Sequence, residues 1–279
     1  MRSFFKCSSQ QALLVFLLSM KVFSCGTPKL KLSDNQLKTT GQSFYEQIAG
    51  APLAIREELA IDMILSGSVP SFLQKLVPVK VAIEDTLTGK RIRATFFVMP
   101  DYVSVGTSTN WARVPLSPMA AQVLADSLGC FLPTAKMVDA IWEQAAVRLD
   151  PVPMYAFRDS SVTFWQHHLI IEGQRQGRKG LIAGIKKDVV LSARVATDPR
   201  PNRVAIYGWH RLNGKVIQPL YVGHVRDYVD YSHGVRLVWK KVKVRGKWME
   251  YTDLLADERL KGLLCAEDDC SFWRYATED

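Results

Sequence analysis

The strongest structural signal in the chain lies in residues 204–222, which read VAIYGWHRLNGKVIQPLYV. Residues 204–209 and 216–222 are rich in β-branched and aromatic side chains, which favour strands. Asn213-Gly214 lies between them and is typical of a tight hairpin turn, because both residue types tolerate positive φ. The stretch therefore predicts two antiparallel strands. Further strands are predicted at 189–191, 235–244 and 248–251.

The first half of the chain predicts mainly helices. Apolar residues recur at helical spacing over 51–66, and Ser117-Pro118 and Pro133-Thr134 are typical helix starts, with ends expected near 129 and 147. Two strands, 79–83 and 91–98, form a hairpin among them. We predict an α+β fold in which helices of the N-terminal half pack on a mainly antiparallel sheet from the C-terminal half, within a single domain over 46–279.

Composition excludes several classes of protein. The 279 residues are 48% hydrophobic and 23% charged, which is typical of a globular chain and excludes a disordered or fibrous one. Beyond the N-terminus no apolar run reaches the ~18 residues of a membrane-spanning helix, which excludes a polytopic membrane protein.

The N-terminus predicts export. Arg2 and Lys6 precede an apolar run over 12–20, and Ser24-Cys25 resembles a bacterial lipobox. We predict a signal peptide over 1–25, a polar tether over 26–45, and a periplasmic or outer-membrane-associated lipoprotein held in the membrane by lipid on Cys25. Cleavage near Ser24 without lipid is the alternative. Removing residues 1–24 takes three cations, Arg2, Lys6 and Lys21, and lowers the net charge from +9 to +6.

Three cysteines remain after the signal segment. Cys265 and Cys270 enclose a short polar loop that a disulfide could close in an oxidising compartment. Cys130 is the odd one. It is either a buried structural residue or a thiol near a helix N-terminus, where the helix dipole would favour the thiolate. A reactive cysteine at a helix start resembles the arrangement in cell-wall cysteine peptidases. The aspartate-cysteine-serine signature of those enzymes is missing here.

The histidines are the most informative feature for function. All five lie between His167 and His233, and His210, His224 and His233 lie beside glycines at predicted strand ends or in loops. Three imidazoles, or two and a carboxylate, can hold zinc with an open position for water. We predict His210, His224 and His233 as metal ligands, with Asp230 as ligand or general base. The alternative is that these histidines are ordinary hydrogen-bonded residues.

Other charged residues offer further candidates. Lys187 and Asp188 enter the strand at 189–191 and could orient an anionic substrate, or form a solvated strand start. Glu143 lies beside Trp142 and could act as a glycosidase acid, or lie on a solvated helix face. The stretch from Arg236 to Lys247 carries six cations and no acid. Alternation places Lys241, Lys243, Arg245 and Lys247 on one strand face, which suits an anionic polymer or lipid surface, or protects an edge strand.

Several longer segments together resemble a family of exported bacterial proteins. They are LPTAKMVD (132–139), GIKKDVV (184–190), IYGWH (206–210) and DYSHG (230–234), within a similarity over roughly 65–240. The resemblance implies a shared fold and export, and no reaction.

The sequence therefore favours an exported hydrolase that acts on a cell-envelope polymer, peptidoglycan by preference. The expected catalytic residues are His210, His233, Asp230, Lys187 and Asp188, and zinc is the expected cofactor. The alternative is a non-enzymatic envelope protein that binds glycan or another anionic polymer. Nucleic acid is not an expected partner, because the chain carries an export signal.

Overall fold

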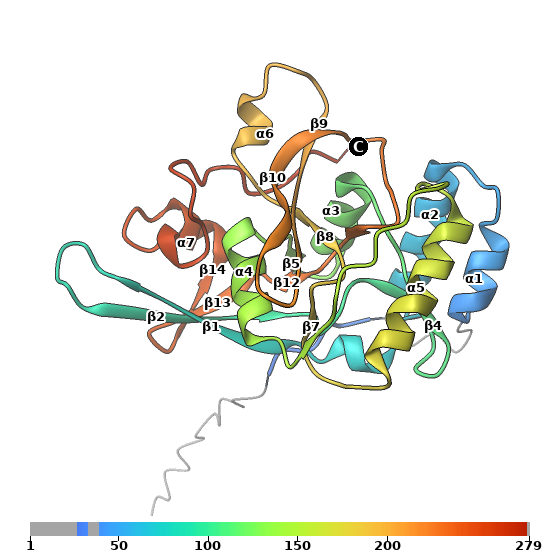
Figure 1. The fold of residues 1–279 in the computed structure, drawn as a ribbon. Helices are drawn as coiled ribbons and strands as arrows, with labels where there is room; N and C mark the ends of the chain where they lie inside the picture. Colours follow the sequence, from blue (N-terminus) through green and yellow to red (C-terminus); the bar gives the residue numbers. More distant parts are fainter. Residues whose placement is uncertain (1–26, 33–38, 278–279) are drawn as a thin grey trace, which may run out of the picture.

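The structure, a computed structural model, describes residues 27–32 and 39–277 (Figure 1). The predicted signal peptide and Cys25 lie outside these residues. Within them the predicted α+β architecture is confirmed, with helices mostly in the first half and sheets mostly in the second. The helices are α1 (Gly41–Gln47), α2 (Leu53–Leu65), α3 (Pro118–Ser127), α4 (Ala135–Gln144), α5 (Ser161–Arg175), α6 (Arg194–Thr197) and α7 (Tyr251–Ala256), with 3-10 turns η1 (Ser71–Gln74) and η2 (Lys261–Leu263).

Two larger sheets form the centre of the molecule. The six-stranded sheet has the order β14-β13-β2-β12-β5, with β1 on β2: β1 (Val77–Glu84), β2 (Arg91–Val98), β5 (Cys130–Phe131), β12 (Val238–Trp239), β13 (Lys241–Val244), β14 (Lys247–Glu250). The four-stranded sheet has the order β10-β9-β8-β11: β8 (Lys187–Val190), β9 (Arg203–His210), β10 (Val216–Val225), β11 (His233–Gly234). Two further pairs are β3 (Ser104–Gly106) with β4 (Trp111–Arg113), and β6 (Val147–Arg148) with β7 (Ile182–Ala183).

The hairpin predicted from 204–222 is confirmed as β9 and β10. These strands pair antiparallel from Val216 opposite His210 to Val225 opposite Arg203. On its other edge β9 pairs with β8, and β8 pairs in parallel with the short strand β11. One sheet therefore contains β8 together with the strands that carry His210, His224 and His233.

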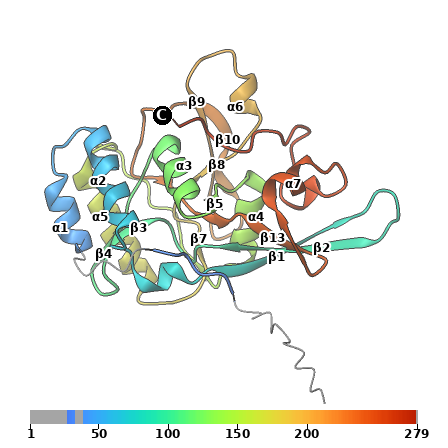
Figure 2. The same ribbon diagram turned by 180° about the vertical axis from the view of Figure 1, so that it is seen from behind.

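The six-stranded sheet takes part of its strands from the first half of the chain. Strands β1 and β2 form the predicted hairpin and pair along their whole length. Helices α4 and α7 lie on one side of this sheet, and α1, α2 and α5 lie side by side at the end of the molecule away from the hairpin tip (Figures 1 and 2).

The predicted starts of α3 and α4 are confirmed, but α4 ends early. Ser117 and Thr134 cap the two helices by accepting hydrogen bonds from the backbone N–H groups of Ala120 and Met137. Helix α4 stops at Gln144 instead of near residue 147. The reason is that Val147 and Arg148 form β6 and pair with β7, so their backbone groups form hydrogen bonds in a sheet and not in the helix.

The folded chain begins within the range predicted as a tether. Leu30 is buried in the core, and α1 begins at Gly41, where Thr40 accepts a hydrogen bond from the N–H of Ser43. Phe44 of α1 is fully buried. Burial of these apolar side chains moves the start of the folded unit toward the N-terminus.

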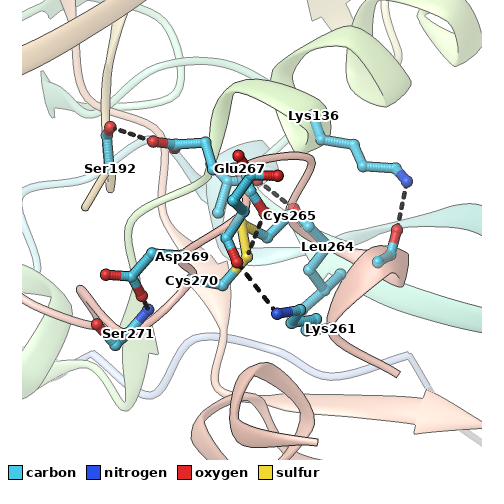
Figure 3. Close-up of a disulfide and its surroundings, with 12 residues drawn as sticks. Lys136, Ser192, Lys261, Leu264, Cys265, Glu267, Asp269, Cys270 and Ser271 are labelled. Atoms are coloured by element: carbon cyan, nitrogen blue, oxygen red, sulfur yellow. Dashed lines mark hydrogen bonds between the residues drawn. A yellow bond between two sulfur atoms is a disulfide. The ribbon is translucent and has the colours of Figure 1, made fainter. Parts of the chain in front are cut away.

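The predicted disulfide between Cys265 and Cys270 is confirmed (Figure 3). Its loop is held to the rest of the fold by Ser192, which donates a hydrogen bond to Glu267 over 2.7 Å. Just before the loop, Lys136 donates a hydrogen bond to the Gly262 carbonyl of η2. Cys130 is buried and unpaired, and burial raises the pKa of its thiol to about 12. That pKa favours the structural reading of Cys130 over the thiolate.

Among the described residues, no helix combines the length and the apolar character needed to cross a membrane.

Candidate functional site

Lys187 and Asp188 are neighbours in β8 and belong to two different groups of polar side chains. Successive strand residues face opposite sides of a sheet, and here each side carries its own group. Lys187 lies over the ring of Trp209, with Nζ 5.0 Å from the ring centroid. Asp188 accepts a hydrogen bond from the Tyr102 hydroxyl over 2.8 Å.

The group on the Lys187 side is only partly buried, and we call it the open cluster. The rings of His224 and His233 lie 5.2 Å apart between centroids, and Tyr228 stacks on His224 at 5.0 Å. Nε2 of His233 lies 4.0 Å from Oδ1 of Asp230 and has no hydrogen-bond partner among the described residues. The members of the open cluster are Arg158, Lys187, His224, Tyr228, Asp230 and His233.

Asp230 is the centre of this cluster and is fully buried. Its Oδ1 accepts hydrogen bonds from the backbone N–H and the hydroxyl of Ser232 over 2.8 and 2.5 Å. Its Oδ2 accepts hydrogen bonds from Arg158 over 2.7 Å and from Tyr228 over 3.2 Å. Arg158 comes from the loop before α5, and its side chain is 43% exposed, so this cation covers the carboxylate from the solvent side.

The charges of the open cluster follow from these contacts. Burial acts to raise the pKa of Asp230, but the nearby His233, the Ser232 hydrogen bonds and Lys187 lower it to about 2. Burial lowers the pKa of His233 to about 3, and burial together with Lys187 lowers the pKa of His224. At pH 7 the cluster therefore holds one carboxylate and two neutral imidazoles beside the cations of Arg158 and Lys187.

The group on the Asp188 side is enclosed by the core, and we call it the buried network. Arg113 forms two hydrogen bonds with Asp101, of 2.9 and 2.6 Å, and both side chains are almost fully buried. Arg236 lies over the ring of Tyr102, at 4.2 Å, with its Nε 3.8 Å from Asp188. The members of the buried network are Asp101, Tyr102, Arg113, His167, His168, Lys186, Asp188 and Arg236.

Burial changes the pKa of several groups in this network. It raises the pKa of Asp188 to about 6, against the opposing effects of Arg236 and Tyr102. Burial and the charge of Arg113 lower the pKa of Lys186 to about 7. Lys186 contacts Nδ1 of His167 at 3.3 Å and donates a hydrogen bond to the Tyr231 carbonyl, which places it between the two groups.

His210, at the end of β9, belongs to neither group and contacts residues of helix α4. Its Nε2 is 2.9 Å from Oδ1 of Asp139, and its ring stacks on Trp142 at 5.4 Å. Tyr207 also donates a hydrogen bond to Asp139, although residues three apart in a regular strand face opposite sides. Gly208 and Trp209 adopt positive φ angles of 106° and 60°, and this breaks the alternation. The structure therefore brings His224 and His233 together and places His210 in a separate group.

Other sequence candidates are separated from the open cluster as well. Glu143 is exposed on α4, where the carboxylate that meets a histidine is Asp139. Sequence patterns did not point to Arg158 or Tyr228 as site residues. Arg158 lies in an irregular loop distant in sequence, and contacts made only on folding bring it to Asp230, among them the backbone hydrogen bond from Tyr231 to the Arg158 carbonyl, 2.9 Å.

Three residues of the open cluster are the candidate zinc ligands. His224, His233 and Asp230 are neighbours whose donor types suit zinc. Within the part of the chain that the structure describes, no three histidine, cysteine or carboxylate side chains already have an arrangement that could hold a metal ion. The zinc site stays a prediction.

Comparisons of the chain with family models, with curated proteins and with solved structures find no match. The resemblance to an exported bacterial family therefore stays a prediction.

Proposed function

We propose that the chain is a hydrolase that acts on an anionic polymer of the cell envelope, peptidoglycan by preference, and that the open cluster is its active site. The observation that carries this proposal is the pair of neutral imidazoles, His224 and His233, beside the ionised Asp230. Neutral imidazole is the commonest general base in proteins, and perturbed titratable groups gather at functional sites.

The proposed reaction is hydrolysis of an amide bond. Water adds to the amide carbonyl carbon, and one imidazole of the pair takes the proton that the water loses. The C–N bond then breaks, and the amine leaves with the proton that the imidazolium returns. The products are a carboxylic acid and an amine. His224 is the ring open to solvent and is the candidate base, while Asp230 stabilises the transient positive charge.

The two cations of the cluster suit an anionic substrate. Lys187 and Arg158 could bind carboxylates of a peptidoglycan peptide, and Arg158 would exchange Asp230 for the substrate anion. Such an anion would also raise the pKa of both imidazoles, which burial, as the largest cause, and the nearby cations now lower. Substrate binding would therefore move the histidines toward the range in which a general base works best.

Two further features support the proposal. The Cys265–Cys270 disulfide suits an oxidising compartment, as expected for an exported periplasmic or outer-membrane lipoprotein. If the enzyme uses zinc, His224, His233 and Asp230 are the residues that would hold it, and the metal would lower the pKa of a bound water.

The second candidate function is polymer binding without turnover. Exposed aromatic side chains occur in the segments that form the open cluster: Tyr155 and Phe157 are 91% and 81% exposed in the loop that carries Arg158, and Tyr221 contacts His224. Phe157 adopts a positive φ of 46°, a backbone conformation that L-residues rarely adopt and that gathers at binding sites. Rings and cations on one surface suit an anionic glycan.

The test compares His224→Gln with His210→Gln on purified peptidoglycan, with and without added zinc. His210 is the matched control, because it is a histidine of the same sheet outside the open cluster. Soluble fragments, new amino groups and new reducing ends are measured, so that amide and glycosidic cleavage are distinguished. We expect His224→Gln to lose activity at least about a hundredfold and His210→Gln to keep it.

Two outcomes would overturn the assignment. Loss of activity in His210→Gln alone would place the site on α4. Wild-type protein that sediments with the polymer and releases no fragment under either condition would favour the binding protein. Because His224 is only half-buried, a His224→Gln variant is expected to fold, and its thermal unfolding serves as the check.

A further inference from the structure

The solvent face of the six-stranded sheet carries a concentration of positive charge. In β2 the side chains alternate between exposed Arg91 and Arg93 and buried Ile92 and Ala94. The register places Lys80 and Lys243 on either side of Thr95, on this same exposed face. We call this surface the basic face, and it consists of Lys80, Arg91, Arg93, Lys241, Lys243 and Arg245.

The sequence prediction for this stripe was wrong at Lys247. The chain turns at Arg245 and Gly246, which both have positive φ, and Lys247 pairs with the core-facing Val244. Trp248 takes the place on the basic face instead, opposite Lys243, whose Nζ lies 5.9 Å from the ring centroid. The face therefore combines cations with an aromatic ring that is 47% exposed.

Most of these cations have no ion-pair partner within the described chain, although Glu84 lies opposite Arg91 in the strand pairing and is exposed on the same face. Lys241 pairs with Glu250 at 3.5 Å, and Arg245 lies 3.7 Å from Asp85. Lys80, Arg91, Arg93 and Lys243 form no ion pair with any described residue. A hollow of about 500 Å³ lies over Lys80, Arg91 and Arg93, which is room for a phosphate-bearing group between these side chains.

The layout of the cations favours a planar partner. They are spread over three neighbouring strands, β1, β2 and β13, and do not follow one line, as a bound polymer strand would require. Helices α4 and α7 lie on the other side of the sheet, so the basic face is open (Figures 1 and 2). The segment 27–32, blue in both views, lies on this open side, with Lys29 and Lys31 exposed.

We propose that the basic face docks on a membrane surface that contains anionic phospholipids. The cations attract the lipid phosphates, and Trp248 enters the headgroup layer, where amphipathic rings are favoured. The first described residues leave the fold on the same side, so a membrane-held N-terminus would bring the basic face toward the lipid. This docking does not depend on the reaction proposed for the open cluster.

The test is co-sedimentation of the full chain with vesicles of phosphatidylcholine, with and without a quarter phosphatidylglycerol. Arg93→Gln/Lys243→Gln is compared with Arg194→Gln/Arg200→Gln, which removes the same charge from α6 and the loop after it. All four side chains lie at the surface, so both variants are expected to fold. Each cation at an anionic surface contributes about fivefold to binding, so the first variant should bind about 25-fold more weakly and the second nearly as wild type.

Three results would overturn the proposal. One is equal binding to neutral and anionic vesicles, since that would reflect apolar segments alone. Another is an equal loss in the two variants, which would reflect net charge and no particular face. The last is tight binding to a soluble polyanion such as dextran sulfate with no binding to vesicles, which would assign the basic face to a polymer.

Discussion

The open cluster and the buried network contain the same kinds of residues, and they share the strand β8. Each has an arginine that holds an aspartate: Arg158 with Asp230 in the open cluster, and Arg113 with Asp101 in the buried network. The arginine side chain is 43% exposed in the first pair and 1% exposed in the second. Exposure therefore separates a pair that a substrate could open from a pair that the fold keeps closed.

The difference indicates separate roles. In the buried network the fold supplies hydrogen-bond acceptors to both arginines: Arg236 donates hydrogen bonds to the carbonyls of Met99 and Ile182, and Arg113 donates one to Glu172. Buried ions of this kind are costly to leave unpaired, so they hold a specific arrangement of segments. An imidazole nitrogen without a hydrogen-bond partner among the described residues occurs in both regions, at His167 and at His233, so the open cluster is distinguished by its exposed Arg158 and its half-buried His224.

The largest effect on stability is expected from breaking the buried ion pair between Arg113 and Asp101. Arg113→Met keeps most of the side-chain volume and leaves Asp101 charged and buried without its partner. We expect the free energy of unfolding to fall by about 3–5 kcal/mol. Urea unfolding measures it. A loss below about 1 kcal/mol would show that this pair is no more important to stability than an exposed one.

A smaller effect concerns the acid sensitivity that the histidines produce. Burial lowers the pKa of His167, of His168 to about 2 and of His233 to about 3, while an unfolded histidine titrates near ~6.5. The unfolded chain therefore binds more protons below pH 6.5, and stability is lost as pH falls from 6.5 toward these lower values. Each histidine adds a slope of about 1.4 kcal/mol per pH unit.

Asp188 acts in the opposite direction, because burial raises its pKa to about 6, so the folded chain gains a proton there between pH 6 and 4. The measurement is urea unfolding at several pH values between 4 and 7 for wild type and His167→Gln. The variant should lose about one histidine's share of the slope. An unchanged slope would mean that His167 is protonated in the folded chain.

The smallest effect on stability is expected from removing Arg158 of the open cluster. Arg158→Met removes a partner that is 43% exposed, and the buried Asp230 keeps its hydrogen bonds from Ser232 and Tyr228, so the free energy of unfolding should fall by only about 1 kcal/mol. If the open cluster binds an anionic substrate, KM should rise in this variant more than kcat falls. Destabilisation as large as that of Arg113→Met would remove the distinction between the two regions.

Parts of the fold were predictable because their signals are local. The turn at Asn213-Gly214 and the caps Ser117 and Thr134 act within a few residues, and each lies where the structure uses it. Helix α5 was not predicted. Its buried side carries His167, His168 and Arg175, so apolar periodicity does not reveal the buried face. Their partners are charged groups: Arg113, from a distant segment, contacts His168, and Glu172 of the same helix pairs with Arg175.

The sequence by itself determined the α+β class, the main hairpins, the disulfide and the region in which the histidines gather. Only the tertiary structure decided which histidines meet, because the positive φ angles at Gly208 and Trp209 turn His210 toward α4. It alone also decided which charges are buried. Asp101 and Asp188 are 87 residues apart, and their pKa depends on partners that folding brings from other segments. Burial and long-range pairing act through space, so no local pattern in the sequence records them.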